Sequence, residues 1–434
     1  MAERSSAARR GALYVLSRCR RFDAWSQQTL ESAGEKFNLD GRDRALCTRL
    51  CRSVLQNAAL CDYYIRCYCS GPVSRLEPQI RDILRLGVCQ ILFLDRIPLP
   101  AAVNESVELA KEIRPGAAGL VNAILRRVGE NQKALPAIPD PGTAQELSVR
   151  FSHPLWLCQW LMEEHGYDFA EALLRENNRE PVRTLTANLC RITPADLEKQ
   201  LTEAGHPARV SPLSWVSVLA ENGGDVTALP GYREGEFFVQ DAGAALSVIS
   251  AGPEAGMRIL DACAAPGGKS FLCASLMRDR GEILACDLHE KKLSRICQGA
   301  ARLGFSSIRT AAMDAARPKD DLAGCFDIVL ADVPCSGLGV IRRKPEIRYR
   351  DPEDLGRLPE VQLSILRGLA GCVRPGGVLA YSTCTIRREE NEEVLRAFLA
   401  DNPEFALEEF RTLWPHIHGT DGFFMGRLRR NVCM

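Results

Sequence analysis

The stretch MRILDACAAPGGKS (257–270) decides the fold of the C-terminal half of the chain. It starts as a short, strand-like apolar run and continues as a turn of small residues and glycines ahead of a helical segment. Glycine and small side chains let the backbone of such a turn approach a ligand closely. The spacing matches neither the G-x-x-x-x-G-K-[ST] phosphate loop nor the G-x-G-x-x-G dinucleotide fingerprint, so the turn predicts no pyrophosphate ligand.

Four further β-rich runs follow, with helical segments between them. They are GEILACD (281–287), SIRTAAMD (307–314), FDIVLADVPC (326–335) and GGVLAYSTC (376–384). Strands separated by helices indicate βαβ units and a parallel sheet that is covered on both faces. We therefore expect residues 235–434 to form an α/β, Rossmann-like domain.

Each of the five runs delivers an acid or a thiol near its end. These residues are Asp261, Asp287, Asp314, Asp332 and Cys384. Ligands of open α/β sheets bind beyond the carboxyl ends of the strands. The pattern therefore predicts a functional site along one rim of the sheet.

The acids on the second and third runs indicate which cofactor this rim binds. Asp287 lies about 20 residues beyond the glycine turn, where an acid accepts hydrogen bonds from ribose hydroxyls; it also suits a helix cap. Asp314 is placed to bind an adenine amino group or to cap a turn. Acids for ribose and adenine without a phosphate loop favour S-adenosylmethionine, which carries adenosine but no phosphate.

The rest of the chain predicts two smaller parts. Residues 1–135 read as a helical bundle, because apolar residues recur at helical spacing in 78–98 and in two segments after it. The Pro-rich stretch ALPAIPDPGT (134–143) indicates a linker. From 144 to 234, helical and strand-like runs alternate, which predicts a small α+β module.

Composition limits the cellular setting and the partners. The 55 basic and 55 acidic residues balance, but residues 1–140 hold 21 basic and 15 acidic residues, which fits a solvated helical surface or one that faces phosphates. The 18 cysteines form no C-x-x-C pair, so we expect no metal site. The polar N-terminus resembles no export signal and no apolar run reaches a membrane-spanning length of about 18 residues, so we expect a cytoplasmic protein with no membrane partner.

Three motifs resemble the RNA cytosine-5 methyltransferases of the Nop/Sun group: residues 261–270, DVPCSG (332–337) and STCT (382–385). RFSHPLWLCQW (150–160) and FFVQDAGA (237–244) are also similar to segments of that group.

The N-terminal stretches PLPAAVNESVELAKE (98–112) and LVNAILRR (120–127) resemble the RNA-binding NusB fold. NusB-like helices ahead of a Sun-type domain are the arrangement of bacterial 16S ribosomal RNA cytosine-5 methyltransferases. The resemblance then spans nearly the whole chain.

The resemblance implies S-adenosylmethionine as cofactor and a single-stranded or loop cytosine of 16S ribosomal RNA as target. We also expect a monomer. It also implies contacts to the cofactor or the target base from Cys263, Ala264, Ala265, Pro266, Gly267, Gly268, Lys269, Asp287, Asp314 and Asp332.

This reaction needs a thiol because carbon 5 of cytosine is a poor nucleophile. A thiolate that adds at carbon 6 converts the ring to an enamine, which can attack a sulfonium methyl group. Asp332 lies close to Cys335 and could support the ring nitrogen at position 3 as charge builds there. A base must then remove the carbon-5 proton so that the enzyme thiol can leave.

Chemistry alone does not choose between Cys335 and Cys384, and either could be a buried structural cysteine. The Pro-Cys motif of DNA cytosine-5 methyltransferases favours Cys335 as the nucleophile. The Nop/Sun resemblance implies Cys384 instead, with Cys335 assisting release of the product.

The basic stretch IRRKPEIRYRDP (341–352) follows the Cys335 motif. We expect its Arg342, Arg343 and Lys344 to contact RNA phosphates and its Tyr349 to stack on a base; the alternative is a solvated basic loop.

Two other functions remain open on the sequence alone. A DNA cytosine-5 methyltransferase is disfavoured by the Thr-Cys motif and the NusB-like helices. A non-enzymatic RNA-binding or assembly factor is disfavoured by the intact acids and both thiols.

Overall fold

The computed structural model describes residues 5–22, 26–221 and 224–432. The chain divides into two compact units. The helical unit comprises the chain through Arg179 together with Arg343–Arg350, and the sheet unit comprises Glu180–Arg342 together with the chain from Asp351. Residues 144–179, which we assigned to the small α+β module, fall in the helical unit; the three-part division of the chain stays a prediction.

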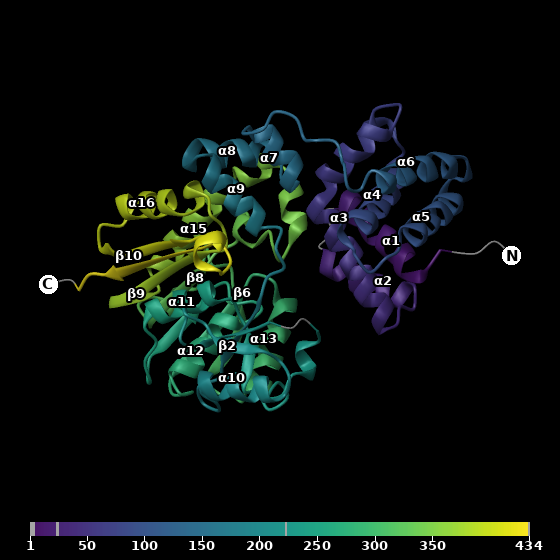
Figure 1. Ribbon diagram of the computed structural model, residues 1–434. Helices are drawn as coiled ribbons and strands as arrows, with labels where there is room; N and C mark the ends of the chain where they lie inside the picture. The colour runs from purple at the N-terminus through teal and green to yellow at the C-terminus, as the bar shows by residue number, and fades with distance from the viewer. Residues whose placement is uncertain (1–4, 23–25, 222–223, 433–434) are drawn as a thin grey trace. The chain divides into compact units, whose positions relative to one another are not determined.

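The helical unit contains the predicted bundle (Figure 1). Its α-helices are α1 (Ala7–Phe22), α2 (Ser26–Lys36), α3 (Gly41–Tyr68), α4 (Pro78–Phe93), α5 (Leu99–Ile113), α6 (Ala118–Glu130), α7 (Ala144–Phe151), α8 (Leu155–His165) and α9 (Tyr167–Glu176). Pro78 is the first residue of α4, where a proline loses no helical hydrogen bond. No helix in the described part of the chain is long and apolar enough to cross a membrane.

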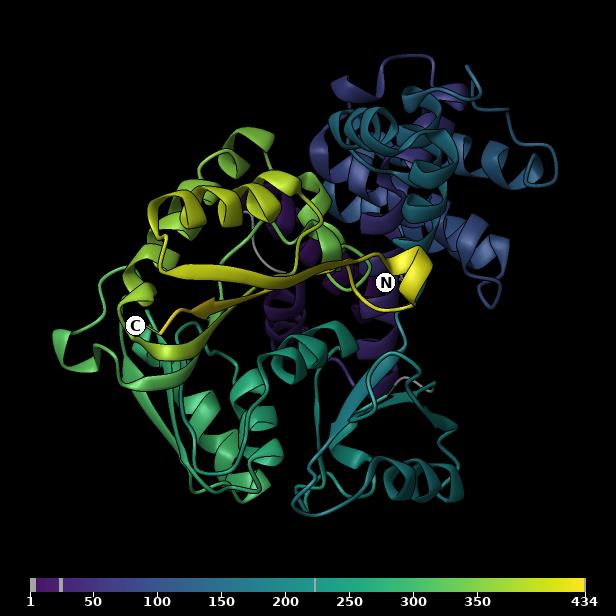
Figure 2. The same ribbon diagram turned by 90° about the vertical axis from the view of Figure 1, so that its left-hand side faces the viewer.

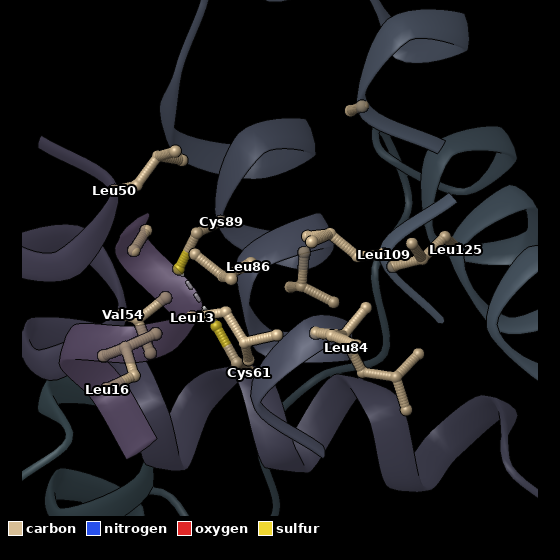
Figure 3. Packing of buried hydrophobic residues seen from close by; sticks show 14 of the residues in the cluster. Leu13, Leu16, Leu50, Val54, Cys61, Leu84, Leu86, Cys89, Leu109 and Leu125 are labelled. Atoms are coloured by element: carbon tan, nitrogen blue, oxygen red, sulfur yellow. Dashed lines mark hydrogen bonds between the residues drawn. The ribbon is translucent and has the colours of Figure 1, made fainter. Parts of the chain in front are cut away.

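Leucines and two cysteines fill the centre of the helical unit (Figure 3). Leu13 of α1, Leu84 of α4 and Leu125 of α6 are at most 5% exposed. Cys61 of α3 and Cys89 of α4 are fully buried among them, with their Sγ atoms 3.5 Å apart. Burial of this continuous apolar face stabilises the helices, which would be marginal in isolation.

Arg343–Arg350 contributes a fully buried arginine to the helical unit. The Arg348 guanidinium donates to the carbonyl oxygens of Gln56 (3.1 Å), Phe151 (3.3 Å) and Ser152 (3.0 Å) and to Oδ1 of Asn178 (3.0 Å). A cation at this place neutralises the carbonyl groups at the C-terminal end of α7. Burial lowers the pKa of Arg348 to about 10, so these acceptors hold a charge that the apolar surroundings disfavour.

The sheet unit contains a seven-stranded sheet in the order β10-β11-β9-β8-β5-β6-β7. Its strands are β5 (Arg258–Asp261), β6 (Glu282–Asp287), β7 (Ile308–Ala312), β8 (Phe326–Asp332), β9 (Val373–Thr383), β10 (Phe405–Leu413) and β11 (Phe423–Arg430). The five predicted strands, β5 to β9, pair in parallel, and the hairpin of β10 and β11 joins β9 antiparallel. The predicted Rossmann-like fold is confirmed.

Helices cover both faces of this sheet, as expected for parallel strands (Figures 1 and 2). The helices are α11 (Ala242–Ala251), α12 (Gly268–Leu276), α13 (Glu290–Leu303), α15 (Leu358–Ala370) and α16 (Glu392–Asp401). Side chains alternate along each strand: on β8, Ile328 packs with α11, α12 and α13, and Val329 packs with α15 and α16. This two-sided burial is why the strands read as nearly continuous apolar runs.

A second, four-stranded antiparallel sheet precedes the larger one within the sheet unit. Its order is β2-β3-β1-β4, built from β1 (Arg183–Ala187), β2 (Ala208–Val210), β3 (Ser217–Ala220) and β4 (Phe237–Val239), with α10 (Pro194–Glu203) packed against it. The predicted α+β character of this region is confirmed. Arg302 of α13 donates to the carbonyl oxygens of Tyr232 (2.6 Å) and Phe237 (3.1 Å) and so ties the two sheets together.

Candidate active site

The carboxyl ends of the parallel strands bring the predicted side chains to one rim. Asp261, Asp287 and Asp332 are the last residues of β5, β6 and β8, and Cys384 directly follows β9. Asp314 comes two residues after β7. Because these strands are parallel neighbours, residues far apart in sequence meet at the same edge.

A cavity of about 590 Å³ opens at this rim. The residues that line it are Ala262, Cys263, Ala265, Asp287, Leu288, His289, Lys292, Met313, Asp314, Ala315, Ala316, Asp332, Val333, Pro334, Glu360, Val361, Ser364 and Ile365. This volume suits a nucleoside-sized molecule, and small-molecule sites are typically apolar with a few convergent polar groups.

The ten predicted cofactor residues divide into two sets. Cys263, Ala265, Asp287, Asp314 and Asp332 line the cavity. The remaining five shape the turn and the first part of α12 without lining the cavity; they are Ala264, Pro266, Gly267, Gly268 and Lys269. Contact of either set with a cofactor stays a prediction.

The glycine turn between β5 and α12 requires its glycine. Gly267 has a φ of +114°, and a Cβ atom on it would lie 2.5 Å from Cζ of Phe271. The Gly267 N–H donates to the Ala264 carbonyl (2.7 Å), and the Ala265–Pro266 peptide bond is cis. This tight turn starts α12 immediately, so Lys269 lies in the first turn of that helix.

The two acids predicted for ribose and adenine also act as local caps. Asp287 Oδ1 accepts from the His289 N–H (3.0 Å) and pairs with Lys292 Nζ (3.2 Å). Asp314 Oδ1 accepts from the Ala316 N–H (3.0 Å). These bonds use one oxygen of each carboxylate, so the capping role is compatible with a ligand at the other oxygen.

Asp332 is the centre of a polar network at the end of β8. Its Oδ2 lies 2.7 Å from Lys269 Nζ, and its Oδ1 accepts from the Ser382 hydroxyl (2.8 Å). Lys269 Nζ also lies 5.2 Å from the centre of the Phe423 ring. The Asp332 side chain is a third exposed and lines the cavity, whereas Lys269, its ion-pair partner, is only a tenth exposed and does not line it.

A second acid is buried behind this network. Asp261 is fully buried, and its Oδ2 accepts from the Ser270 hydroxyl (2.6 Å). Burial raises the pKa of Asp261 to about 6, although the Ser270 hydrogen bond and the Lys269 charge oppose the rise. The rim therefore contains one carboxyl group that takes up a proton near neutral pH.

The two candidate thiols meet at the ends of β8 and β9. Cys335 Sγ and Cys384 Sγ are 3.2 Å apart, and both residues are partly exposed. The contact with Cys384, burial, and the nearby carboxylates of Glu390 and Asp332 raise the pKa of Cys335 well above its ordinary value. This shift disfavours the thiolate form of Cys335.

Close backbone packing fixes the Cys384 side of the pair. The Gly339 N–H donates to the Cys384 carbonyl (3.0 Å), and the Gly422 N–H donates to the Gly339 carbonyl (2.8 Å). A Cβ atom on Gly339 would lie 1.9 Å from the Gly422 carbonyl oxygen, so this approach excludes any larger residue.

The expectation that Arg342 meets RNA phosphates is wrong. The Arg342 Nε–H donates to Asp421 Oδ1 at 2.8 Å, and both side chains are only 5% exposed. A buried arginine is paired because an unpaired charge would be strongly disfavoured there. Tyr349 is half exposed, but its hydroxyl donates to the Leu55 carbonyl (2.6 Å) within the helical unit.

Several residues around the site escaped the sequence analysis. Leu288 lines the cavity and is 63% exposed, and α15 contributes Glu360, Val361 and Ser364 to the wall. Helical residues without a motif carry no sequence signal. For Leu288 the sequence offered one indication of a site residue: this leucine directly follows Asp287, the acid that ends the second predicted strand.

No cluster of three or more metal-ligating side chains occurs among the residues that the structure describes. A parallel sheet that ends at a nucleoside-sized cavity, with acids and two thiols on the rim, defines the class: a Rossmann-like α/β protein with a candidate nucleoside site.

Comparisons with known proteins identify the family. Residues 248–429 match the 16S rRNA methyltransferase RsmB/F family, residues 6–130 the NusB family, and residues 153–227 the ferredoxin-like domain of RsmF/B-like methyltransferases. The chain is 36% identical to the probable ribosomal RNA small subunit methyltransferase B of Bacillus subtilis, over 96% of this chain and 98% of that protein. It is 34% identical to the ribosomal RNA small subunit methyltransferase B of Klebsiella pneumoniae, over 90% of this chain and 91% of that protein.

Solved structures agree on the fold. The crystal structure of PH0851 covers 99% of this chain with a TM-score of 0.81 at 25% identity, with all of that protein included. NSun6 from Pyrococcus horikoshii, crystallised with SFG, covers 64% with a TM-score of 0.58 at 21% identity and 98% of that protein.

The chain belongs to the ribosomal RNA small subunit methyltransferase B family. This confirms the predicted Sun-type and NusB-like resemblance, and it disfavours both a DNA methyltransferase and a non-enzymatic assembly factor.

Proposed function

We propose that the protein methylates carbon 5 of a cytosine in 16S ribosomal RNA through a covalent adduct between an enzyme thiol and carbon 6. The observation that carries this proposal is the pair of partly exposed thiols, 3.2 Å apart, next to Asp332. Two thiols are more than a methyl transfer to oxygen or to an exocyclic nitrogen needs. They suit a reaction in which a thiol must both attack and leave.

S-adenosylmethionine supplies the methyl group when it is bound. Asp287 would accept hydrogen bonds from the ribose hydroxyls, and Asp314 would bind the adenine amino group. Leu288, which is exposed beside them, offers an apolar surface for the adenine ring. SFG, which accompanies the similar NSun6 structure, is an analogue of S-adenosylmethionine.

The chain's own thiol and charged groups act on the cytosine ring. The sulfur of Cys384 forms a bond to carbon 6, and the electron pair of the carbon 5–carbon 6 double bond shifts into the ring to give an enamine. Carbon 5 then bonds to the methyl carbon as the methyl–sulfur bond breaks, and the electron pair of that bond stays on the donor sulfur. The Lys269–Asp332 pair supports the charge that builds at the ring nitrogen at position 3. A base then takes the carbon-5 proton, and the electron pair of that carbon–hydrogen bond re-forms the double bond between carbons 5 and 6. The carbon–sulfur bond breaks at the same time, and its electron pair leaves with the Cys384 sulfur as thiolate.

The assignment of the nucleophile to Cys384 comes from the family resemblance, and the local chemistry supports it. The contact with Cys384, burial and neighbouring carboxylates raise the pKa of Cys335, which disfavours its thiolate form. The thiolate is the attacking form of a cysteine. Cys335 is therefore suited to the later stage, in which the adduct breaks down.

A pair of substitutions tests the proposal on full-length protein with 16S ribosomal RNA and labelled S-adenosylmethionine. Cys384→Ala should reduce methyl transfer at least about 1,000-fold and form no adduct. Cys335→Ala should accumulate a protein–RNA complex that survives denaturation, because attack proceeds and release is slow. Sequencing the RNA after reduction should locate the new methyl group on carbon 5. Adduct accumulation in Cys384→Ala, or methylation at another atom, would overturn the proposal.

A further inference from the structure

A buried acid and a buried amide lie behind the loop that carries Cys335. Glu390 ends a short 3-10 turn, Arg388–Glu390, and Gln362 belongs to α15; neither side chain is exposed. Gln362 Nε2 donates to Glu390 Oε2 at 3.0 Å. Nothing in the proposed chemistry assigns a role to either residue.

The two side chains hold the backbone on both sides of Cys335. The Ser336 N–H donates to Glu390 Oε2 (2.8 Å), and Gln362 Nε2 donates to the Pro334 carbonyl (3.0 Å). The peptide groups before and after Cys335 are thus fixed by one connected pair. Since Cys335 has a single side-chain torsion to its sulfur, this restricts where its Sγ atom can lie.

The loop that carries Cys335 is also joined to the segment that carries Cys384. The hydroxyl oxygens of Ser336 and Thr385 are 2.6 Å apart, which links the residue after Cys335 to the residue after Cys384. The Tyr381 hydroxyl donates to the Glu390 carbonyl (2.5 Å) and anchors the acid to β9. Hydrogen bonds on both segments therefore maintain the 3.2 Å distance between the two sulfur atoms.

A charged group is costly to bury, so its position here calls for a reason beyond folding. Glu390 Oε1 lies 3.7 Å from the Arg387 guanidinium, whereas Oε2 accepts hydrogen bonds from the Ser336 N–H (2.8 Å) and from Gln362 Nε2 (3.0 Å). The neighbouring acid Glu389 is 40% exposed and pairs with the same arginine at 3.4 Å. Of these two consecutive glutamates, one serves the Cys335 loop and the other faces solvent.

We propose that Glu390 and Gln362 are positioning residues that hold Cys335 against Cys384 and thereby set the rate at which the covalent adduct breaks down. The inference rests on the proposed function, because it needs an adduct to release. The negative charge of Glu390 also raises the pKa of the nearby Cys335 thiol and so favours its protonated form.

The test measures adduct formation and adduct breakdown separately, using full-length protein, 16S ribosomal RNA and labelled S-adenosylmethionine. Glu390→Ala should slow breakdown about tenfold or more, raise the fraction of denaturation-resistant complex, and leave the rate of adduct formation and the KM for RNA within about twofold. Glu390→Gln keeps an acceptor for Ser336 and should show a smaller effect. Glu389→Ala is the matched control and should behave like the parent protein.

A double substitution distinguishes positioning from general damage to the fold. If Glu390 acts through Cys335, adding Glu390→Ala to Cys335→Ala should slow breakdown no further than Cys335→Ala alone. A structural effect would instead multiply with that of Cys335→Ala, and this result would overturn the inference. Gln362→Met provides a second test of the same pair if Glu390→Ala folds poorly.

The two proposals fail in different ways. If the single Cys384→Ala and Cys335→Ala variants do not separate attack from release, the proposed function is wrong. If the two cysteine variants do separate attack from release, but the adduct of Glu390→Ala breaks down at the parent rate, only the positioning role is wrong.

Discussion

Two pairs of cysteines in this protein have similar geometry and different surroundings. Cys61 and Cys89 of the helical unit have their sulfur atoms 3.5 Å apart, and those of Cys335 and Cys384 in the sheet unit are 3.2 Å apart. The first pair is fully buried among leucines (Figure 3), and the second is partly exposed at strand ends. Proximity of two sulfur atoms alone does not mark a reactive site.

The surroundings explain the difference. Burial, the contact with Cys89 and the nearby Asp62 raise the pKa of Cys61 well above its ordinary value, and apolar helices exclude any substrate. Such a thiol is inert. The sheet pair lies beside the ion pair of Lys269 and Asp332, which can stabilise charge as a substrate reacts. Access and neighbouring polar groups, rather than sulfur geometry, therefore separate a reactive pair from a structural one.

Among substitutions that leave both reactive thiols in place, the largest effect should come from removing charge beside them. Asp332→Asn keeps a partner for the Ser382 hydroxyl but removes the negative charge paired with Lys269, so methyl transfer should fall about 100-fold. Single-turnover assays with 16S ribosomal RNA measure this rate. The control is Asp327→Asn at the opposite end of β8, where Asp327 pairs with Arg374. An unchanged rate in Asp332→Asn would show that the charge beside the thiols does not matter.

A smaller effect should appear in the pH dependence of stability. The pKa of Asp261 is about 6 in the folded protein and about 3.9 unfolded, so its contribution is present below pH 4 and lost as the pH rises through 6. Above pH 7 the buried carboxylate should destabilise the fold by about 2–3 kcal/mol.

Asp261→Asn removes this titration. Urea unfolding should find the Asn variant more stable than the parent protein at pH 8, with the two free energies of unfolding converging near pH 4. A difference that does not change with pH would contradict the raised pKa.

The smallest effect should come from the buried pair. Cys89→Ala removes one atom from a packed core and should lower the free energy of unfolding by about 1–2 kcal/mol without changing methyl transfer. Urea titration and the methylation assay together measure both quantities. The exposed Cys67 gives a control, because Cys67→Ala should change neither. A loss of activity in Cys89→Ala at full occupancy of the folded state would remove the contrast between the two pairs.

The rim of the site was predictable from the sequence because a simple pattern determines it. Continuous apolar runs indicate strands buried on both faces, and the residue that ends each run must then lie at the ligand-binding edge. Asp261, Asp287, Asp332 and Cys384 all lie at or directly after strand ends for this reason.

The residues that support the rim were not predictable in the same way. Arg342 looks like a solvated base within a basic loop, and only the fold reveals its buried partner Asp421, which lies 79 residues later. Glu389 and Glu390 are identical neighbours in sequence, and the direction of one short turn decides which of them is buried. Such roles depend on long-range contacts that local patterns do not encode.

The buried Arg348 has a consequence for how this protein can be divided. The backbone passes between the two units at 179/180, 342/343 and 350/351, so the helical unit is discontinuous in sequence. A fragment that ends at Arg179 lacks the guanidinium that four acceptors of its interior share, two of them at the end of α7. The helical unit is therefore assembled from two separate stretches of the chain: the ribosome makes Arg343–Arg350, which supply the buried guanidinium, only after most of the chain has been made.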